Sequence, residues 1–228
     1  MAEAAINTER VFEDACQHCG TRSDGAHFCA QCGKIQPVAP GPDYLRFMGL
    51  PRKLRIDEAE LEKSFYALSR QFHPDYFRAT SEQERQASVE RSSMLNDAYR
   101  TLRDSVARVS YLLTLEGYKE VEKKAPPDLL EEVFELNMQV EELKAAKKIG
   151  DADEVFEARE SLDEALTGLR QKLASIDEGL FALFGEWDSA IDRDATTDEK
   201  KPLLDRMRER LSYRSYIRHL VRGIEEEL

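Results

Sequence analysis

Long apolar runs are missing from this 228-residue sequence: no stretch of eighteen consecutive apolar residues occurs in it, so we expect no membrane-spanning helix. The first ten residues carry two acids, one arginine and no apolar stretch, so we expect neither a secretory signal nor a transit peptide. Glycine is scarce, with 11 residues, whereas 34% of the residues are charged, a balance that favours helices over a sheet sandwich. We therefore expect an all-α protein of the cytoplasm, long enough for one or two cores.

Motifs of common catalytic sites are missing as well. The sequence has no glycine-rich phosphate loop, and it has no lone nucleophile that is paired with a base. We therefore predict that the protein is not an enzyme.

Negative charge is unevenly distributed along the chain. The formal net charge is −12, to which residues 1–40 contribute −2, residues 41–120 zero and residues 121–228 −10. An acidic helix repels phosphate backbones, so we expect no nucleic-acid partner. A basic protein surface would suit the acidic part. A solvated acidic face kept for solubility explains the charge equally well.

All four cysteines lie in one short segment, as two Cys-x-x-Cys pairs with nine residues between them: Cys16 with Cys19, and Cys29 with Cys32. Each pair is followed directly by a glycine, which permits the backbone to curl beneath the thiolates. Two such turns facing each other complete a tetrahedral four-sulfur site, the geometry that suits zinc best. Iron in a rubredoxin-like site uses the same ligands and remains an alternative.

This metal site is expected to be structural, because four protein sulfurs leave no open coordination position. The segment from Ala15 to Lys34 is too short to bury a core, so metal binding has to fold it. We expect metal removal to unfold residues 15–34 only. Disulfides are a weaker explanation in the absence of a secretory signal. His18 and His27 are expected to be bystanders, since four thiolates are available.

The tripeptide His73-Pro74-Asp75 separates two helical patterns, Asp57 to Phe72 and Ser81 to about Leu113. Proline cannot continue a helix and disfavours helical angles in the residue before it, so we expect the tripeptide to form an exposed turn. Such a turn would hold an imidazole and a carboxylate out in solvent. The alternative is an ordinary helical hairpin in which the histidine only caps a helix.

Both helical patterns carry capping signals and an apolar face. Asp57 with Glu60, and Ser81 with Glu84, are spaced as capping boxes. The two apolar faces consist of Leu61, Phe65, Leu68 and Phe72, and of Val89, Leu95, Ala98, Tyr99 and Leu102.

With the short amphipathic segment Asp43–Pro51 in front of them, these features resemble a J-domain, the module that stimulates ATP hydrolysis by heat-shock chaperones of the DnaK/HscA type. The resemblance implies that the chaperone-binding residues are His73, Pro74 and Asp75 of the turn, with Arg70 and Lys63 of the preceding helix. That helix has less positive charge than J-domains commonly show, which would suit a dedicated chaperone partner.

Composition breaks divide the chain into parts. The stretch from Gln36 to Pro42 contains three prolines and a glycine, as linkers do. A second break runs from Lys119 to Pro127, where two prolines precede a helical pattern. We expect a metal-binding segment at 1–36, a linker at 37–42, a J-domain at 43–120 and a helical bundle at 121–228.

The last part carries three helical patterns joined by short connections. The first runs from Pro127 to about Lys148 and stops at Gly150. The second spans roughly Asp151 to Ile191, and Pro202 is expected to open the third. Three antiparallel helices with short loops form a bundle.

The first bundle helix carries two apolar lines. One line, expected in the core, consists of Leu129, Val133, Leu136, Val140 and Leu143. The second line lies on the opposite side and consists of Leu130, Phe134 and Met138, bordered by Glu131, Glu135 and Glu142. One helix in a small bundle rarely buries two opposite faces, so the second line predicts a partner surface. Packing beneath the J-domain or the last helix is the alternative.

A J-domain followed by an acidic three-helix bundle resembles the HscB family of co-chaperones, which is dedicated to iron–sulfur cluster assembly. The four-cysteine segment is similar to the extension of mitochondrial members. The resemblance implies that the segment around Leu129–Asn137 grips a cluster scaffold protein of the IscU type. The scaffold-binding residues it implies are Leu130, Phe134, Glu135, Met138, Glu142 and, on the last helix, Tyr213. Glu131 and Met138 depart from the family, which usually has methionine and glutamate at these positions.

The family resemblance implies delivery of the scaffold and switching of the chaperone, with the turn favouring the hydrolysis-competent state. Two other functions are open to this sequence. A general J-domain co-chaperone would need glycine/phenylalanine-rich or β-rich client regions, which the chain does not show. A zinc-ribbon regulator of nucleic acid would need a basic surface, yet residues 1–40 carry −2.

Overall fold

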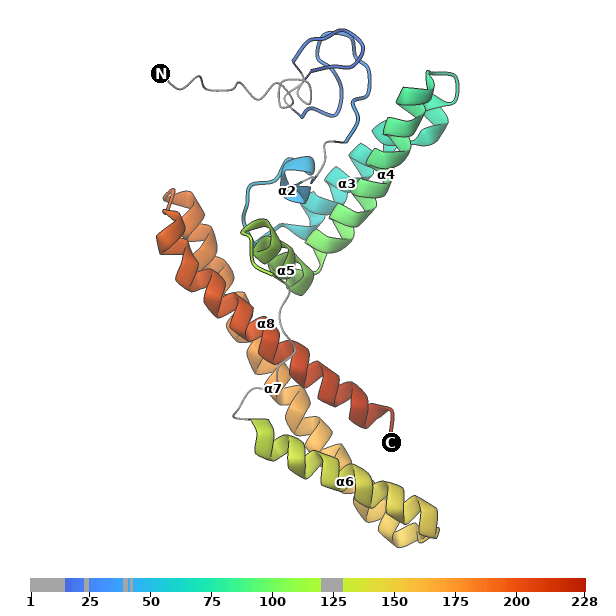
Figure 1. The fold of residues 1–228 in the computed structure, drawn as a ribbon, viewed down its shortest axis with the longest axis vertical. Helices are drawn as coiled ribbons and strands as arrows, with labels where there is room; N and C mark the ends of the chain where they lie inside the picture. The colour runs from blue at the N-terminus through green and yellow to red at the C-terminus, as the bar shows by residue number, and fades with distance from the viewer. Residues whose placement is uncertain (1–14, 23–24, 39–40, 42, 120–128) are drawn as a thin grey trace, which may run out of the picture. The chain divides into compact units, whose positions relative to one another are not determined.

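In the computed structural model, the described residues are 15–22, 25–38, 41, 43–119 and 129–228. Within these ranges the chain is helical, with two isolated β-bridges and no strand, which confirms the all-α expectation (Figure 1). None of the described helices is both long enough and apolar enough for a bilayer crossing. The chain divides into two units, which we describe separately: Met1–Arg52 with Ile56–Arg108, and Lys53–Arg55 with Val109–Leu228.

The N-terminal unit contains the short helix α2 (Tyr44–Phe47), α3 (Glu58–Phe72), the 3-10 helix η1 (Pro74–Phe77) and α4 (Glu82–Arg103). Ser81 and Glu84 form the expected reciprocal capping box at the start of α4. The box expected at α3 is only half formed. The carboxylate of Asp57 accepts from two backbone N–H groups of the first turn, but Glu60 pairs with Lys63 instead of reaching back.

Helices α3 and α4 pack against each other as a hairpin, with Leu61, Phe72 and Leu102 fully buried between them. The prediction that Val89 belongs to the apolar face is wrong, because its side chain is 54% exposed. The inward positions of this part of α4 are instead Ser88 and Arg91. Ser88 and Arg91 continue the three- and four-residue spacing of Leu95, Ala98 and Leu102, but with polar side chains.

The continuous helix expected from Ser81 to Leu113 is broken at Asp104, whose backbone is extended. The Asp104 carboxylate accepts from the N–H of Ala107 at 2.7 Å and so begins a new helix, α5 (Ser105–Leu115). Arg108 donates to the carbonyl of Leu102 at 2.6 Å, which satisfies a terminal acceptor of α4.

The C-terminal unit contains α6 (Leu130–Ile149), α7 (Ala152–Asp192) and α8 (Thr197–Glu225), with α7 packed against both of the others. Gly150, in the left-handed region at φ +84°, ends α6 as expected. The prediction that Pro202 opens α8 is wrong. A capping box between Thr196 and Glu199 starts the helix earlier, and the proline costs one backbone hydrogen bond in its exposed first turns.

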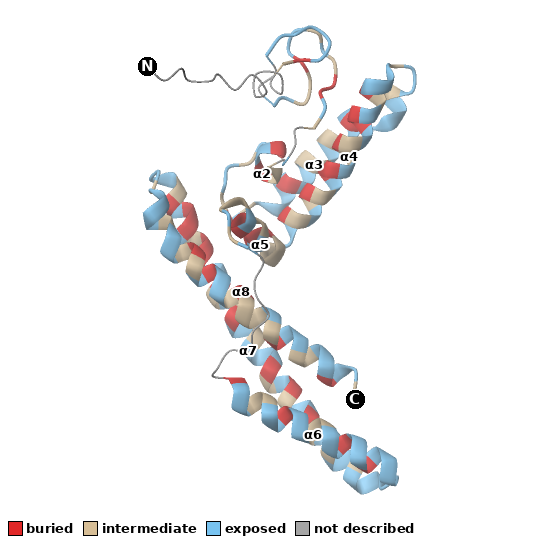
Figure 2. Cartoon of the chain, in the orientation of Figure 1, coloured by how far each residue is buried: buried red, intermediate tan, exposed pale blue. Residues whose placement is uncertain are grey.

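The core of this unit runs along α7 as a buried stripe (Figure 2). It is formed by Leu162, Leu166, Leu169 and Ile176 of α7, by Leu129, Leu136 and Leu143 beside or on α6, and by Ile217 and Ile224 of α8. Val133 and Val140 pack against it, partly buried. The first apolar line is therefore a core seam, as expected.

The segment Lys53–Arg55, which belongs to the C-terminal unit, is bound to the second half of α7. The buried carboxylate of Asp188 accepts from the N–H groups of Leu54 and Arg55, at 2.7 and 3.1 Å. The guanidinium of Arg55 crowds the position that a Cβ on Gly185 would take, with Nη2 only 2.8 Å from that position. The glycine therefore leaves room for an arginine, and α7 runs through it as a single helix.

Residues 120–127 of the break expected at Lys119 to Pro127, and residues 39, 40 and 42 of the linker expected at 37–42, lie outside the described residues.

Candidate functional site

Each Cys-x-x-Cys pair sits in a tight turn that an antiparallel bridge closes, Ala15 with Arg22 in the first turn and Phe28 with Ile35 in the second. The two turns are built alike. In each, the first cysteine donates its N–H to the carbonyl five residues on, at 2.7 and 2.9 Å, and accepts from the N–H of the glycine at 2.8 Å. Gly20 and Gly33 have φ +73° and +71°, left-handed angles that a Cβ would strain.

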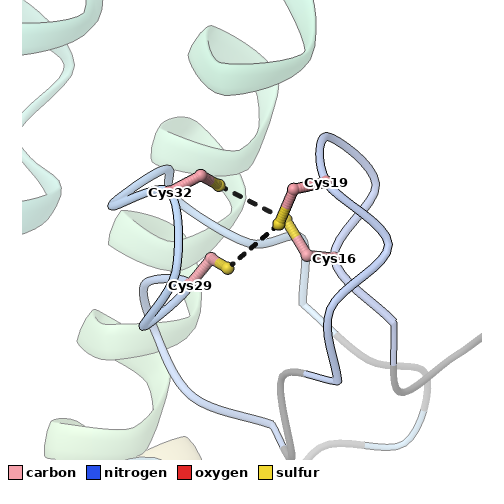
Figure 3. A group of neighbouring side chains, drawn as sticks. All are labelled: Cys16, Cys19, Cys29 and Cys32. Carbon is pink, nitrogen blue, oxygen red and sulfur yellow. Dashed lines mark hydrogen bonds between the residues drawn. The ribbon is translucent and has the colours of Figure 1, made fainter.

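The two turns bring all four sulfurs together. The Sγ atoms of Cys16, Cys19, Cys29 and Cys32 lie within 4.8 Å of one another, and the pairs Cys16–Cys32 and Cys19–Cys29 are 3.6 Å apart (Figure 3). A tetrahedral ion with metal–sulfur bonds of about 2.3 Å separates its ligands by about 3.8 Å. The four sulfurs therefore fit a single tetrahedral metal ion, and no histidine or carboxylate of the described residues joins the cluster.

Hydrogen bonds favour the thiolate form on the first pair. Thr21 lowers the pKa of Cys19 through its hydroxyl and its N–H. At Cys16 burial raises the pKa, but the N–H groups of His18 and Cys19 outweigh it and lower the pKa to about 6. At Cys32 the N–H of Lys34 lowers the pKa, whereas burial and the other sulfurs raise it to about 12. Such a cluster keeps part of its protons until a cation replaces them.

His27 is neither a ligand nor a bystander. Its ring packs edge-on against Phe47 and Phe72, with centroids 4.8 and 4.9 Å away, and its Nδ1 lies 2.6 Å from Nη1 of Arg91. Burial, with the neighbouring guanidinium, lowers the pKa of His27 to about 4. The imidazole is therefore neutral, and Nδ1 accepts because arginine can only donate.

Arg91 is the residue that the sequence interpretation missed. It lies on α4 and is 3% exposed. Its Nε donates to the carbonyl of Gln36 at 2.5 Å, and its Nη2 donates to those of Pro37 and Ala26 at 3.1 and 3.4 Å. Burial lowers its pKa to about 10, so the side chain stays charged. A charged side chain at an inward position of α4 was the signal in the sequence.

The turn His73-Pro74-Asp75 joins α3 to η1, and all three residues are exposed. Nδ1 of His73 accepts from the N–H of Asp75 at 3.3 Å, so the histidine also caps η1. The Asp75 carboxylate pairs with Arg78 at 2.7 Å. The turn therefore presents a carboxylate and an imidazole to solvent.

Lys63 and Arg70, the two basic residues expected to assist the turn, are exposed on α3. Lys63 pairs with Glu60 at 3.4 Å, and Arg70 donates to the carbonyl of Tyr66 at 3.3 Å. Their part in chaperone binding stays a prediction.

The second apolar line of α6 is open to solvent: Leu130 is 57%, Phe134 66% and Met138 49% exposed. The bordering acids Glu135 and Glu142 are exposed as well. An apolar face of this kind lies on the side of α6 that the bundle core does not use. The exposure fits a partner surface and leaves the identity of the partner to other observations.

Tyr213 differs from these residues. It is half-buried on α8 and packs against the core of the C-terminal unit. Its contribution to a partner surface stays a prediction, and its side chain also supports the bundle.

Comparison with known proteins identifies the module around the turn. Residues 43–111 match the model of the DnaJ domain family. The match covers α2, α3, η1, α4 and most of α5.

Matches that extend beyond the DnaJ domain include co-chaperones named HscB. The chain is 32% identical over 200 residues to the iron-sulfur cluster co-chaperone protein HscB of Mus musculus, covering 85% of this chain and 76% of that protein. It is 33% identical over 154 residues to the co-chaperone protein HscB homolog of Vibrio cholerae, covering 66% of this chain and 86% of that protein. The crystal structure of the human co-chaperone protein HscB matches with a TM-score of 0.64 and 27% identity, over 93% of this chain and 97% of the human one. The chain therefore belongs to the HscB family of J-domain co-chaperones.

Proposed function

We propose that this co-chaperone of iron–sulfur cluster assembly binds an IscU-type scaffold protein and delivers it to an HscA/DnaK-type heat-shock chaperone, whose ATPase it stimulates. One observation carries the proposal: a chain of the HscB family presents both an exposed His73-Pro74-Asp75 turn and an exposed apolar line on α6. The iron–sulfur role in this proposal is based on the name of the mouse relative.

The turn acts on the chaperone by binding. Asp75 and its partner Arg78 are both exposed, and an exposed ion pair contributes little to stability, so a cation of the chaperone can replace Arg78 at low cost. The proline limits the freedom of the turn and so reduces the ordering cost of docking. The contact shifts the chaperone towards hydrolysis only if it is stronger in the hydrolysis-competent state. His73 performs no chemistry in this scheme.

The second apolar line acts on the scaffold. Leu130, Phe134 and Met138 offer apolar and aromatic anchors, and the acids beside them suit basic residues at the rim of an interface. The core seam on the opposite face holds α6 against α7, so the anchors stand on a supported helix.

The four-cysteine site is proposed to hold one structural zinc ion. Its ligands are all protein sulfur, and their spacing suits a closed tetrahedral site. The role of the protein is then binding and switching, with no reaction of its own.

Single-turnover ATP hydrolysis by the purified chaperone tests the proposal. The full chain should accelerate hydrolysis, and adding the scaffold should increase the acceleration further. Calorimetric titration should show one scaffold bound per chain. Stimulation without scaffold binding, together with capture of unfolded clients, would indicate a general J-domain co-chaperone. Absence of both activities contradicts the proposed function.

A further inference from the structure

The ribbon, residues 15–22 and 25–38, and the hairpin of α3 and α4 meet at Arg91. We propose that Arg91 is a positioning residue that couples metal binding in the ribbon to the order of the His73-Pro74-Asp75 turn. The chaperone arm of the test below rests on the proposed chaperone function, and the other readouts rest on the zinc ion proposed for the four-cysteine site.

Arg91 depends on the ribbon for its hydrogen bonds. Its partners among the described residues are the carbonyls of Ala26, Gln36 and Pro37 and the ring of His27. All of them belong to the ribbon, and no carboxylate hydrogen-bonds the guanidinium in the described structure. A buried cation without such acceptors is costly. Unfolding of the ribbon therefore forces Arg91 to move into solvent or to lose its hydrogen bonds inside the hairpin.

The part of the hairpin beside Arg91 leads directly into the turn. Phe72 is the last residue of α3, is fully buried and precedes His73. The Arg91 guanidinium lies 5.7 Å from the centroid of the Phe72 ring. The centroids of the Phe28 and Phe72 rings are 6.0 Å apart. The hydroxyls of Ser88 and Ser92 on α4 donate to the carbonyl of Phe72 at 2.6 and 3.1 Å. Ribbon and α4 together thus hold the residue from which the turn projects.

A second contact ties the ribbon to the start of α4. Lys34, two residues after the last cysteine, pairs with Glu84 at 3.2 Å. Glu84 also completes the capping box with Ser81. The ribbon therefore contacts the hairpin both at the residue before the turn and at the beginning of the helix after it.

Coupling of this kind is reciprocal. If the folded ribbon stabilises the hairpin, the hairpin must raise the affinity of the ribbon for its metal by the same factor. The expectation that metal removal unfolds residues 15–34 only leaves out these contacts. The contacts indicate instead that the end of α3 and the first half of α4 lose order when the metal leaves.

The test compares full-length wild type with Arg91→Met, Arg91→Lys and Arg100→Met. Arg91→Met removes the fork of donors but keeps an apolar stem, and Arg91→Lys keeps the charge without the planar fork. Arg100 is the matched control, an exposed arginine of the same helix that pairs with Asp97. The readouts are amide hydrogen exchange with and without a zinc chelator, and the rate of zinc release to a chromophoric chelator.

In wild type, removing zinc should raise the exchange rates of α3's last turn and of the first half of α4 by about 5- to 150-fold, the usual range of coupling factors. Arg91→Met should speed zinc release by a similar factor, Arg91→Lys should restore part of the loss, and Arg100→Met should match wild type. The absorption spectrum of the Co²⁺-substituted protein should be the same in all four, because the ligands are unchanged.

Unchanged exchange in α3 and α4 of zinc-free wild type overturns the proposal, and so does zinc release from Arg91→Met at the wild-type rate. If Arg91→Met fails to fold, the wild-type exchange comparison decides alone. In the chaperone arm, zinc-free wild type should stimulate ATP hydrolysis less than the zinc-bound form. A zinc-bound form that stimulates no chaperone contradicts the proposed function, while exchange and release still decide the coupling.

Discussion

Asp75 and His73 are exposed residues whose side chains do little for the fold. The histidine caps η1 and the aspartate pairs with an exposed arginine, so both contacts lie at the protein surface. Substitutions at the turn can therefore separate chaperone binding from folding.

We predict that Asp75→Asn raises the chaperone concentration needed for half-maximal stimulation by about tenfold or more. The change keeps the size of the side chain but deletes a charge, and a hydrogen bond to a charged group contributes about 1.5–3 kcal/mol. His73→Gln should act in the same direction. Single-turnover hydrolysis, with circular dichroism to check helicity, measures both effects.

The control for this pair is Arg78→Gln, which removes the partner of Asp75 in the free protein and leaves the carboxylate in place. It should keep stimulation near the wild-type level. Stimulation at the wild-type level by Asp75→Asn would contradict the proposed role of the turn in chaperone binding.

The residues around Arg91 show where residue-level prediction from sequence stops. The cysteine spacing predicts the metal cluster because ligand geometry depends on local turns. The hydrogen bonds of Arg91 join it to residues more than fifty positions away in the sequence, which no local pattern encodes. Its apolar character alone places Val89 on the predicted apolar face, although the helical spacing of Leu95, Ala98 and Leu102 places Ser88 and Arg91 inward.

At the scale of elements, α6 has one face for the fold and one for solvent. Its core seam and its exposed second line were both predictable, because a helix of known period fixes which residues share a face. Helix ends were less predictable. Asp104 interrupts a helical pattern that contains no glycine or proline, and Thr196 starts α8 ahead of Pro202, which is the stronger helix-start signal in the sequence.

We predict that Leu130→Ala and Phe134→Ala each weaken scaffold binding by about 1–3 kcal/mol, or roughly 5- to 150-fold in Kd, without lowering the melting temperature appreciably. Both side chains are exposed in the free protein, so they contribute little to its folding. Leu136→Ala is the matched control on the same helix. It removes a buried side chain and should cost about 2–5 kcal/mol of stability.

Calorimetric titration with the scaffold and thermal melts distinguish the two faces. Early melting of Leu130→Ala and Phe134→Ala with unchanged scaffold affinity would assign the second line to the fold and remove the argument for a scaffold partner.

Tyr213 on α8 allows a sharper comparison. Because its ring packs partly against the bundle core, Tyr213→Ala should lower both scaffold affinity and the melting temperature, whereas Tyr213→Phe, which keeps the ring, should lower the melting temperature less. The same titrations and melts apply. Wild-type affinity in a destabilised Tyr213→Ala would show that the tyrosine serves the bundle alone.

At the scale of the whole molecule, the two units have separate sources of stability. The N-terminal unit combines a four-cysteine cluster with a helical hairpin, whereas a largely aliphatic core runs along α7 in the C-terminal unit. No residue of that core belongs to the ribbon or the hairpin. Loss of the metal should therefore lower the stability of the N-terminal unit and leave that of the C-terminal unit unchanged.

We predict one tightly bound metal ion per chain, colourless if it is zinc, and four thiols that titrate only after a chelator has removed it. The closed set of four sulfurs supports both statements, since bound thiolates are protected from reagents. After chelation, hydrogen exchange along the buried stripe of α6, α7 and α8 should keep its original rates. Elemental analysis, thiol titration and exchange measurements on the same sample check these points together. Well under one metal per chain, with four freely titrating thiols, would remove the metal site. Faster exchange throughout α6–α8 would show instead that the bundle depends on the metal, against the separation of its core from the ribbon.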